Sequence, residues 1–195
     1  CGGDSDSGDG AGILCSIPWN YLEKEVNFKN KEDFDKGLGM IFMPNKKEKI
    51  EECKLICDEE AEKLRINKTS WRTVPVNNEI LGPLAKANAP FITQWILYIN
   101  KKDSQDIERL LFQLRKRIEK KIRETFKNHV GDCEFYFASL SSQTVVYKGM
   151  VRSEILSEFY QDLREESFKV SFSVYHRRFS TNTLPKWPLA QPMRF

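Results

Sequence analysis

The chain has 195 residues, of which 40% are hydrophobic and 30% are charged, with 13 Phe, 6 Tyr and 4 Trp. This size and composition are typical of one domain with a sizeable core, and they exclude a globally disordered or collagen-like chain. The formal charge is only +3, from 31 Lys+Arg and 28 Asp+Glu, so the balance does not predict nucleic acid or an anionic membrane as the main partner.

The N-terminal third begins with CGGDSDSGDGAG, whose Gly, Asp and Ser favour turns. A short apolar strand is predicted over residues 13–17, and a second over 37–44, where GLGMIFMP is too short and too apolar for a surface helix. Helical spacing of apolar residues predicts a helix over about 46–65. Its apolar positions are Ile50, Cys53, Ile56 or Cys57, Ala61 and Leu64.

The middle of the chain holds its clearest helix. An extended segment over 71–76 and short helical turns over 82–90 come first. The apolar run at 90–99 is interrupted by Thr93 and Gln94, so we expect no membrane-spanning helix. Residues 104–127 then predict a long amphipathic helix. Its apolar stripe consists of Ile107, Leu110, Leu111, Leu114, Ile118, Ile122 and Phe126.

The C-terminal third is predicted to be mainly antiparallel. Residues 134–140 and 144–148 suggest a hairpin around Ser141-Ser142, and a short helix is expected over 153–159. Residues 169–176 alternate as a strand with an apolar face, and 179–195 are expected to form a loop. Strands, then long helices, then antiparallel strands indicate the α+β class.

The five cysteines are an odd number spread thinly over the chain, which favours a reducing compartment over a secreted disulfide framework. Cys53 and Cys57 lie four residues apart on a predicted helix with no histidine near them in sequence, so we interpret them as buried thiols rather than zinc ligands. Cys1 could be an N-terminal nucleophile, but the turn-rich sequence after it does not predict a rigid terminus. We therefore do not expect Cys1 to be catalytic, and we predict no metal site.

Basic residues cluster on the predicted helix 104–127, with Glu108, Glu119 and Glu124 interleaved among them. This pattern is typical of a solvated helix face. The alternative function that it leaves open is a nonenzymatic binding module that uses this helix for a partner.

Arg178 lies two residues after His176, on the parity of the apolar face of the strand at 169–176. An inward-facing guanidinium requires an anionic partner, so Arg178 is a candidate clamp for a carboxylate ligand. An Asp or Glu of the protein would explain an inward Arg178 equally well.

Several segments together resemble the class II glutamine amidotransferase (glutaminase) domain of glutamate synthases. They are GDGAGIL at 8–14, GLGMIFMP at 37–44, VPVNNEILGPLAKANAP at 74–90, LSSQTVVYKGM at 140–150, FYQDLREESF at 159–168 and HRRFSTNTLPKWPLAQPMRF at 176–195. The resemblance implies an N-terminal nucleophile hydrolase fold, a four-layer αββα sandwich with antiparallel sheets. It also implies that residues 1–195 are a partial amidotransferase type 2 domain, incomplete at both ends.

The resemblance also implies roles for individual residues. Arg178 matches the arginine that grips the α-carboxylate of glutamine, and Phe179, Thr181 and Asn182 match residues that line the pocket. Arg177 departs from the family, in which a small polar residue precedes that arginine. The catalytic cysteine and the oxyanion-hole motif are expected outside residues 1–195, so the segment alone is expected to be inactive.

In the full-length enzyme, the resemblance implies hydrolysis of glutamine to glutamate and ammonia, followed by reductive formation of glutamate from 2-oxoglutarate. The implied partners are glutamine and the downstream synthase domains of the same chain. No cofactor is expected in this segment, while FMN and an iron–sulfur cluster are implied for the remainder. The expected location is intracellular, in the cytoplasm or a plastid.

Overall fold

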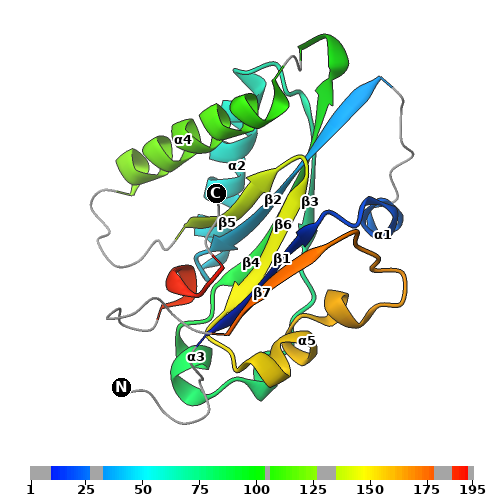
Figure 1. Ribbon diagram of the computed structural model, residues 1–195. Helices are drawn as coiled ribbons and strands as arrows, with labels where there is room; N and C mark the ends of the chain where they lie inside the picture. The colour runs from blue at the N-terminus through cyan, green and yellow to red at the C-terminus, as the bar shows by residue number, and fades with distance from the viewer. Residues whose placement is uncertain (1–9, 27–32, 104–105, 127–134, 178–185, 193–195) are drawn as a thin grey trace.

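The computed structural model describes residues 10–26, 33–103, 106–126, 135–177 and 186–192. Two antiparallel sheets lie face to face, and two long helices cover the outer face of the larger one (Figure 1). The described strands are β1 (Ala11–Ser16), β2 (Phe34–Met43), β3 (Lys68–Thr73), β4 (Phe91–Asn100), β5 (Tyr136–Ser141), β6 (Thr144–Gly149) and β7 (Ser173–His176). The described α-helices are α1 (Trp19–Glu25), α2 (Lys47–Glu62), α3 (Pro83–Ala87), α4 (Ile107–Thr125) and α5 (Leu156–Phe159). The expected α+β class is confirmed.

The larger sheet has four strands in the order β3-β4-β2-β5, and the smaller has three in the order β6-β1-β7. Strand β4 is one of the two central strands of the larger sheet, and the sequence analysis did not assign it. Both of its faces are buried: Ile92, Ile96 and Tyr98 pack between the sheets. Trp95, Leu97 and Ile99 pack against the helices on the other face. A strand buried on both faces has a nearly continuous apolar sequence, so the period of two that marks a strand is lost.

The predicted helices at 46–65 and 104–127 are confirmed as α2 and α4. Their apolar positions pack against the four-stranded sheet; Cys53 and Cys57 on α2 are fully buried there, as expected for buried thiols. Asp58 fixes α2 to the sheet, because its carboxylate accepts hydrogen bonds from the indole nitrogens of Trp71, at 2.9 Å, and Trp95, at 3.1 Å. The two indole rings are stacked with centroids 5.2 Å apart. No described helix is long and apolar enough to cross a bilayer.

The prediction that the strands on either side of Ser141-Ser142 pair with each other as a hairpin is wrong. Strand β5 pairs with β2 in the four-stranded sheet, whereas β6 pairs with β1 in the three-stranded sheet, so the chain changes sheets at this turn. Glu108 of α4 holds the turn. Its Oε1 atom accepts hydrogen bonds from the amide of Ser142, at 2.7 Å, and from the hydroxyls of Ser141 and Ser142, at 3.1 Å and 2.6 Å. A contact from a distant helix thus sets a turn that looks local in sequence.

We predict that Glu108→Ala lowers the free energy of unfolding by about 1–2 kcal/mol, because it leaves the partly buried amide and hydroxyls of this turn without their acceptor. Urea unfolding followed by tryptophan fluorescence measures the change. Glu124→Ala is the matched control on the same helix, since Glu124 forms an exposed pair with Lys120 at 4.0 Å and should change stability by no more than about 0.5 kcal/mol. Equal effects of the two variants would contradict the role given to Glu108.

Candidate functional site

The predicted site residues Arg178, Phe179, Thr181 and Asn182 lie outside the described residues, as does Cys1. What the structure describes is the two flanks of the segment 178–185. One flank is the end of β7, and the other is the short 3-10 helix η5 (Trp187–Leu189). The site is therefore built from these flanks and the elements that they contact.

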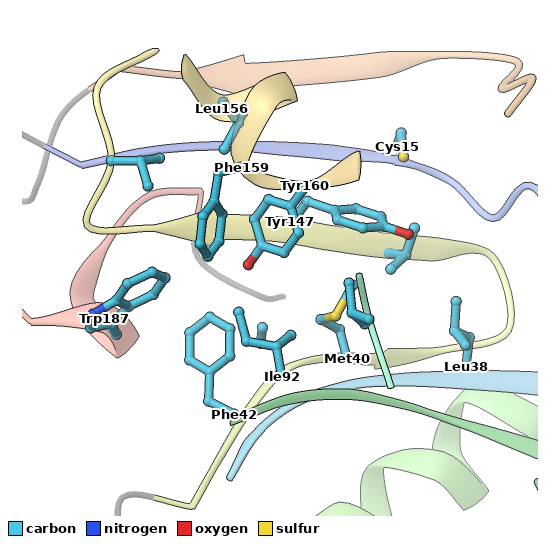
Figure 2. Packing of buried hydrophobic residues seen from close by; sticks show 14 of the residues in the cluster. Cys15, Leu38, Met40, Phe42, Ile92, Tyr147, Leu156, Phe159, Tyr160 and Trp187 are labelled. Atoms are coloured by element: carbon cyan, nitrogen blue, oxygen red, sulfur yellow. The ribbon is translucent and has the colours of Figure 1, made fainter. Parts of the chain in front are cut away.

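Both flanks lie at one end of the three-stranded sheet. His176 at the end of β7 pairs with Gly12 near the start of β1, and Gly12 also pairs with Lys148 near the end of β6. Trp187 of η5 is buried between the sheets, with ring centroids 6.1 Å from Phe42 and 5.5 Å from Phe159. Figure 2 shows these three aromatic side chains gathered at this end of the core. The chain leaves this end at β7 and returns to it at η5.

Arg177 is the last described residue of the first flank, and it has a partner at the surface. Its guanidinium lies 3.3 Å from the carboxylate of Glu154, and its Nε atom donates to Ser153, also at 3.3 Å. Hydrogen bonds from its own backbone amide and from Ser153, followed by the charge of Arg177, lower the pKa of Glu154. The guanidinium of Arg177 is thus paired at the surface, outside the core.

The prediction that residues 169–176 form a strand with one buried apolar face is wrong. Only Ser173–His176 form β7, which in the described residues pairs with β1 at the edge of the three-stranded sheet, and all four residues of the strand are exposed. Phe172 and Val174, expected on a buried face, are 49% and 58% exposed. The argument that Arg178 continues a buried apolar face therefore fails, and the assignment of Arg178 depends on the family resemblance.

A buried polar network lies between the two sheets, and the sequence analysis missed it. Asp162 is fully buried and accepts hydrogen bonds from both terminal nitrogens of Arg72, at 2.8 Å and 2.7 Å. It also accepts from the hydroxyls of Tyr21, at 2.8 Å, and Tyr147, at 2.9 Å. Gln94 joins the network by accepting from Arg72 and donating to Tyr147. The network thus links α1, β3, β4 and β6 with the segment after α5.

Within this network the guanidinium of Arg72 is held in its charged form and the two phenols in their neutral forms. Burial alone would lower the pKa of Arg72, but the hydrogen bonds and the charge of Asp162 outweigh it and raise that pKa. Burial, together with the adjacent Asp162, raises the pKa values of Tyr21 and Tyr147, so both phenols remain donors at neutral pH. Because each of these groups has its partners, the network is suited to holding the layers together rather than to transferring protons.

Lys148 is a second buried polar residue that the sequence analysis did not single out. Its ammonium donates to the carbonyl of Pro188, at 2.8 Å, and to the hydroxyl of Tyr136, at 3.2 Å. The signal in the sequence is a lysine inside an apolar strand, TVVYKG, whereas Arg72 lies in the mainly polar KTSWRT and gives no such signal. A charge at such a position indicates either an edge facing solvent or a partner within the protein, and in this structure Lys148 has two such partners.

The described cysteines Cys15, Cys53 and Cys57 are free thiols within the core. Burial raises the pKa of Cys15 to about 12. The pKa of Cys57 is raised by burial and by the charge of Asp58. None of the three therefore has the properties of a reactive nucleophile.

We predict that Cys15 resists alkylation in the native protein. With a pKa of about 12, only about one thiol in 10,000 is ionised at pH 8, and the thiolate is the reactive form. Iodoacetamide labelling with peptide-resolved mass spectrometry should modify Cys15 only after unfolding in guanidinium. Labelling of Cys15 at equal rates in native and unfolded protein would contradict this prediction.

The remaining candidates have structural explanations. On α4 the exposed basic residues lie beside acidic ones, as in the pairs of Lys116 with Glu119 and of Lys120 with Glu124. Arg117 pairs with Glu60 of α2 at 2.9 Å, so part of the basic set joins the two helices. Among the described basic residues of α4, the predicted solvated face is confirmed except for Arg115, which is buried; Lys127 lies outside the described residues. Within the described part of the chain, no three His, Cys, Asp or Glu side chains form a group that could hold a metal ion.

Comparison with known proteins gives one consistent result. The family model described as "Glutamine amidotransferases class-II" matches residues 1–195. The chain is 46% identical over 199 residues to ferredoxin-dependent glutamate synthase 1, chloroplastic/mitochondrial, of Arabidopsis thaliana. It is 46% identical over 198 residues to the ferredoxin-dependent glutamate synthase of Pyropia yezoensis. It is 43% identical over 198 residues to ferredoxin-dependent glutamate synthase 2 of Synechocystis. Each alignment covers 100% of this chain but only 12% or 13% of the relative.

Proposed function

The chain belongs to the class II glutamine amidotransferase family, and we propose that it acts as the glutaminase domain of a glutamate synthase. The observation that carries the proposal is similarity along the whole chain to three enzymes with that name, at 43% to 46% identity. The finer fold that we propose is the four-layer αββα sandwich of N-terminal nucleophile hydrolases. The two stacked antiparallel sheets and the layer of α2 and α4 support it.

In this proposal Arg178 binds the α-carboxylate of glutamine, and Phe179, Thr181 and Asn182 line the pocket. A guanidinium forms two parallel hydrogen bonds with a carboxylate, which fixes its orientation as well as its charge. Two observations support Arg178. In sequence it lies two residues after His176, the end of β7, and the neighbouring Arg177 has its own partner in Glu154.

The reaction that we propose is hydrolysis of the side-chain amide of glutamine. A cysteine thiolate outside this segment attacks the amide carbon, ammonia leaves, and water hydrolyses the glutamyl thioester to glutamate. The ammonia then serves the downstream domains of the same protein, which form glutamate from 2-oxoglutarate. FMN and an iron–sulfur cluster are assigned to those domains.

Two further properties follow from the names of the relatives. The Arabidopsis, Pyropia and Synechocystis enzymes are named ferredoxin-dependent, so we propose ferredoxin as the electron donor of the intact protein. The rice and spinach relatives are named chloroplastic. We propose a plastid as the location, with the cytoplasm as the alternative compartment.

The test uses the purified full-length protein, assayed for glutamate formation from 2-oxoglutarate with glutamine or ammonia as the nitrogen source. We expect both reactions, and we expect glutamine hydrolysis to be lost on treatment with a glutamine analogue that alkylates thiols. Absence of glutamine hydrolysis would overturn the proposal. Reversal of charge at Lys120 and Lys121, both exposed on α4, should leave the activity unchanged. Loss of activity in that variant would contradict the interpretation of this helix face as merely solvated.

A further inference from the structure

We propose that the outer face of the three-stranded sheet, the face turned away from the larger sheet, is covered in the intact protein by polypeptide that follows Phe195. The uncovered part of this face consists of Leu14 on β1, Val174 on β7 and Phe172 just before β7, and we call these three residues the outer strip. The inference rests on the function proposed above in one respect, namely that residues 1–195 belong to a longer protein.

The alternation of side chains along the strands identifies the face on which the outer strip lies. Ile13 and Cys15 of β1 pack into the core between the two sheets, so Leu14 between them points away from that core. Leu14 pairs with Val174 of β7, and Phe172 lies two residues before Val174, on the same side of the strand. The outer strip therefore extends to the edge of the sheet, where Figure 1 shows β7 in orange.

Exposure increases across this face towards β7. Leu14 pairs with Val146 of β6 on one side and with Val174 of β7 on the other. Val146 is buried and Leu14 is partly buried, whereas Val174 is 58% exposed and Phe172 is 49% exposed. The sequence of residues 170–175, VSFSVY, contains no charged residue. Continuous apolar surface without charges at a sheet edge is typical of an interaction site rather than of an edge that faces solvent.

The course of the C-terminal segment indicates what covers the outer strip. Gly12 lies on the same face of β1 as Leu14, two residues and about 7 Å away. A Cβ atom at Gly12 would lie 2.5 Å from the carbonyl oxygen of Gln191 and 2.9 Å from Cδ of Pro192, so these two residues lie against this face. Phe195 is three residues further on, which is at most about 11 Å of chain. Polypeptide that follows Phe195 therefore begins close to the outer strip.

The length of the relatives and the covalent connection favour this occupant over a second molecule. The alignments cover only 12% or 13% of the relatives, so most of each relative lies outside the matched segment. A segment tethered near the outer strip has a high effective concentration there, which a second copy of the protein would have to exceed. The proposed cover is therefore intramolecular.

The test is hydroxyl-radical footprinting of the full-length protein, with oxidation at each phenylalanine measured by peptide-resolved mass spectrometry. Phe112 on α4 is the internal reference, because it is 52% exposed in this structure and Phe172 is 49% exposed. A cover should take Phe172 from about half exposed to about one-twentieth exposed, so we expect Phe172 to be oxidised roughly tenfold more slowly than Phe112. Equal oxidation rates at the two positions would overturn the proposal.

A matched pair of variants tests the cover directly. Val174 is 58% exposed and Leu55 on α2 is 59% exposed. A carboxylate at position 174 is costly to bury beneath an apolar cover, so Val174→Asp in the full-length protein should raise the oxidation of Phe172 severalfold. Leu55→Asp should leave the oxidation of Phe172 unchanged. Equal oxidation of Phe172 in the two variants would count against a cover.

Dilution and crosslinking test the identity of the cover. A tethered segment protects Phe172 equally at low and high protein concentration. Loss of protection on dilution would assign the cover to a second molecule and overturn the proposal. An amine-reactive crosslinker at the exposed Lys169 should reach lysines that follow Phe195. Crosslinks from Lys169 only to residues 1–195, or only to residues before Cys1, would also overturn it.

These measurements do not depend on activity, so they separate the inference from the proposed function. If Phe172 is protected but the full-length protein does not hydrolyse glutamine, the glutaminase function fails and the covered face stands. If glutamine is hydrolysed while Phe172 and Phe112 react equally, the covered face is wrong and the glutaminase function stands.

Discussion

Replacing Asp162 by alanine is expected to lower the free energy of unfolding by about 3–5 kcal/mol, because it leaves the guanidinium of Arg72 buried without its counter-charge. Arg72 is only 8% exposed, and both of its terminal nitrogens donate to Asp162. Its contact with Glu25, at 3.2 Å, reaches a carboxylate that is half exposed and cannot replace Asp162. The variant also removes the acceptor of two buried phenols, Tyr21 and Tyr147.

Urea unfolding with a fitted m-value measures this loss. The double variant Arg72→Met, Asp162→Leu is the informative control. Replacing both members of a buried ion pair by apolar groups removes the uncompensated charge, so the double variant should be more stable than Asp162→Ala. A loss below about 1 kcal/mol for Asp162→Ala, or a double variant less stable than either single one, would contradict the role assigned to this pair.

The helices that the sequence predicted are those in which one face meets the core. Helices α2 and α4 were visible because their apolar residues recur with helical spacing against charged neighbours. Strands β2 and β4 are both buried on both faces and show no alternation. Strand β2 was predicted from its short apolar run at 37–44, whereas the apolar run of β4 was not assigned to a strand. Helix α1 has only 7 residues, too few to show a period.

The errors in pairing and burial have a different cause. The sequence around Ser141-Ser142 predicts a turn correctly, but which strands pair on either side depends on Glu108, 33 residues away, and on the two sheets. Likewise, alternation in residues 169–176 predicts a strand but not whether a layer covers it. Local patterns indicate the conformation of a segment, whereas its partners are set by tertiary contacts.

At the candidate site, too, local sequence indicates some of the residues but not their partners. Lys148 is visible in the sequence as a charge within the apolar strand TVVYKG, but Arg72 lies in the mainly polar KTSWRT. Their partners, the carbonyl of Pro188 and Asp162, lie 40 and 90 residues away in sequence. Arg178 was found only through its motif, because the one physical argument from the residues, a buried apolar face on β7, does not hold. Its role therefore requires a functional test.

In the full-length protein, Arg178→Lys is expected to lower kcat/KM for glutamine by roughly 30- to 150-fold, the equivalent of losing one charge-assisted contact of about 2–3 kcal/mol. Lysine keeps the charge but cannot form two parallel hydrogen bonds with the α-carboxylate. Glutamate formation from free ammonia does not require the glutamine pocket and should be nearly unchanged. Arg177→Lys is the neighbouring control: Arg177 is paired at the surface with Glu154, so its replacement should have little effect. If Arg177→Lys were the damaging change, or if both activities fell together in Arg178→Lys, Arg178 would not be the residue that holds glutamine.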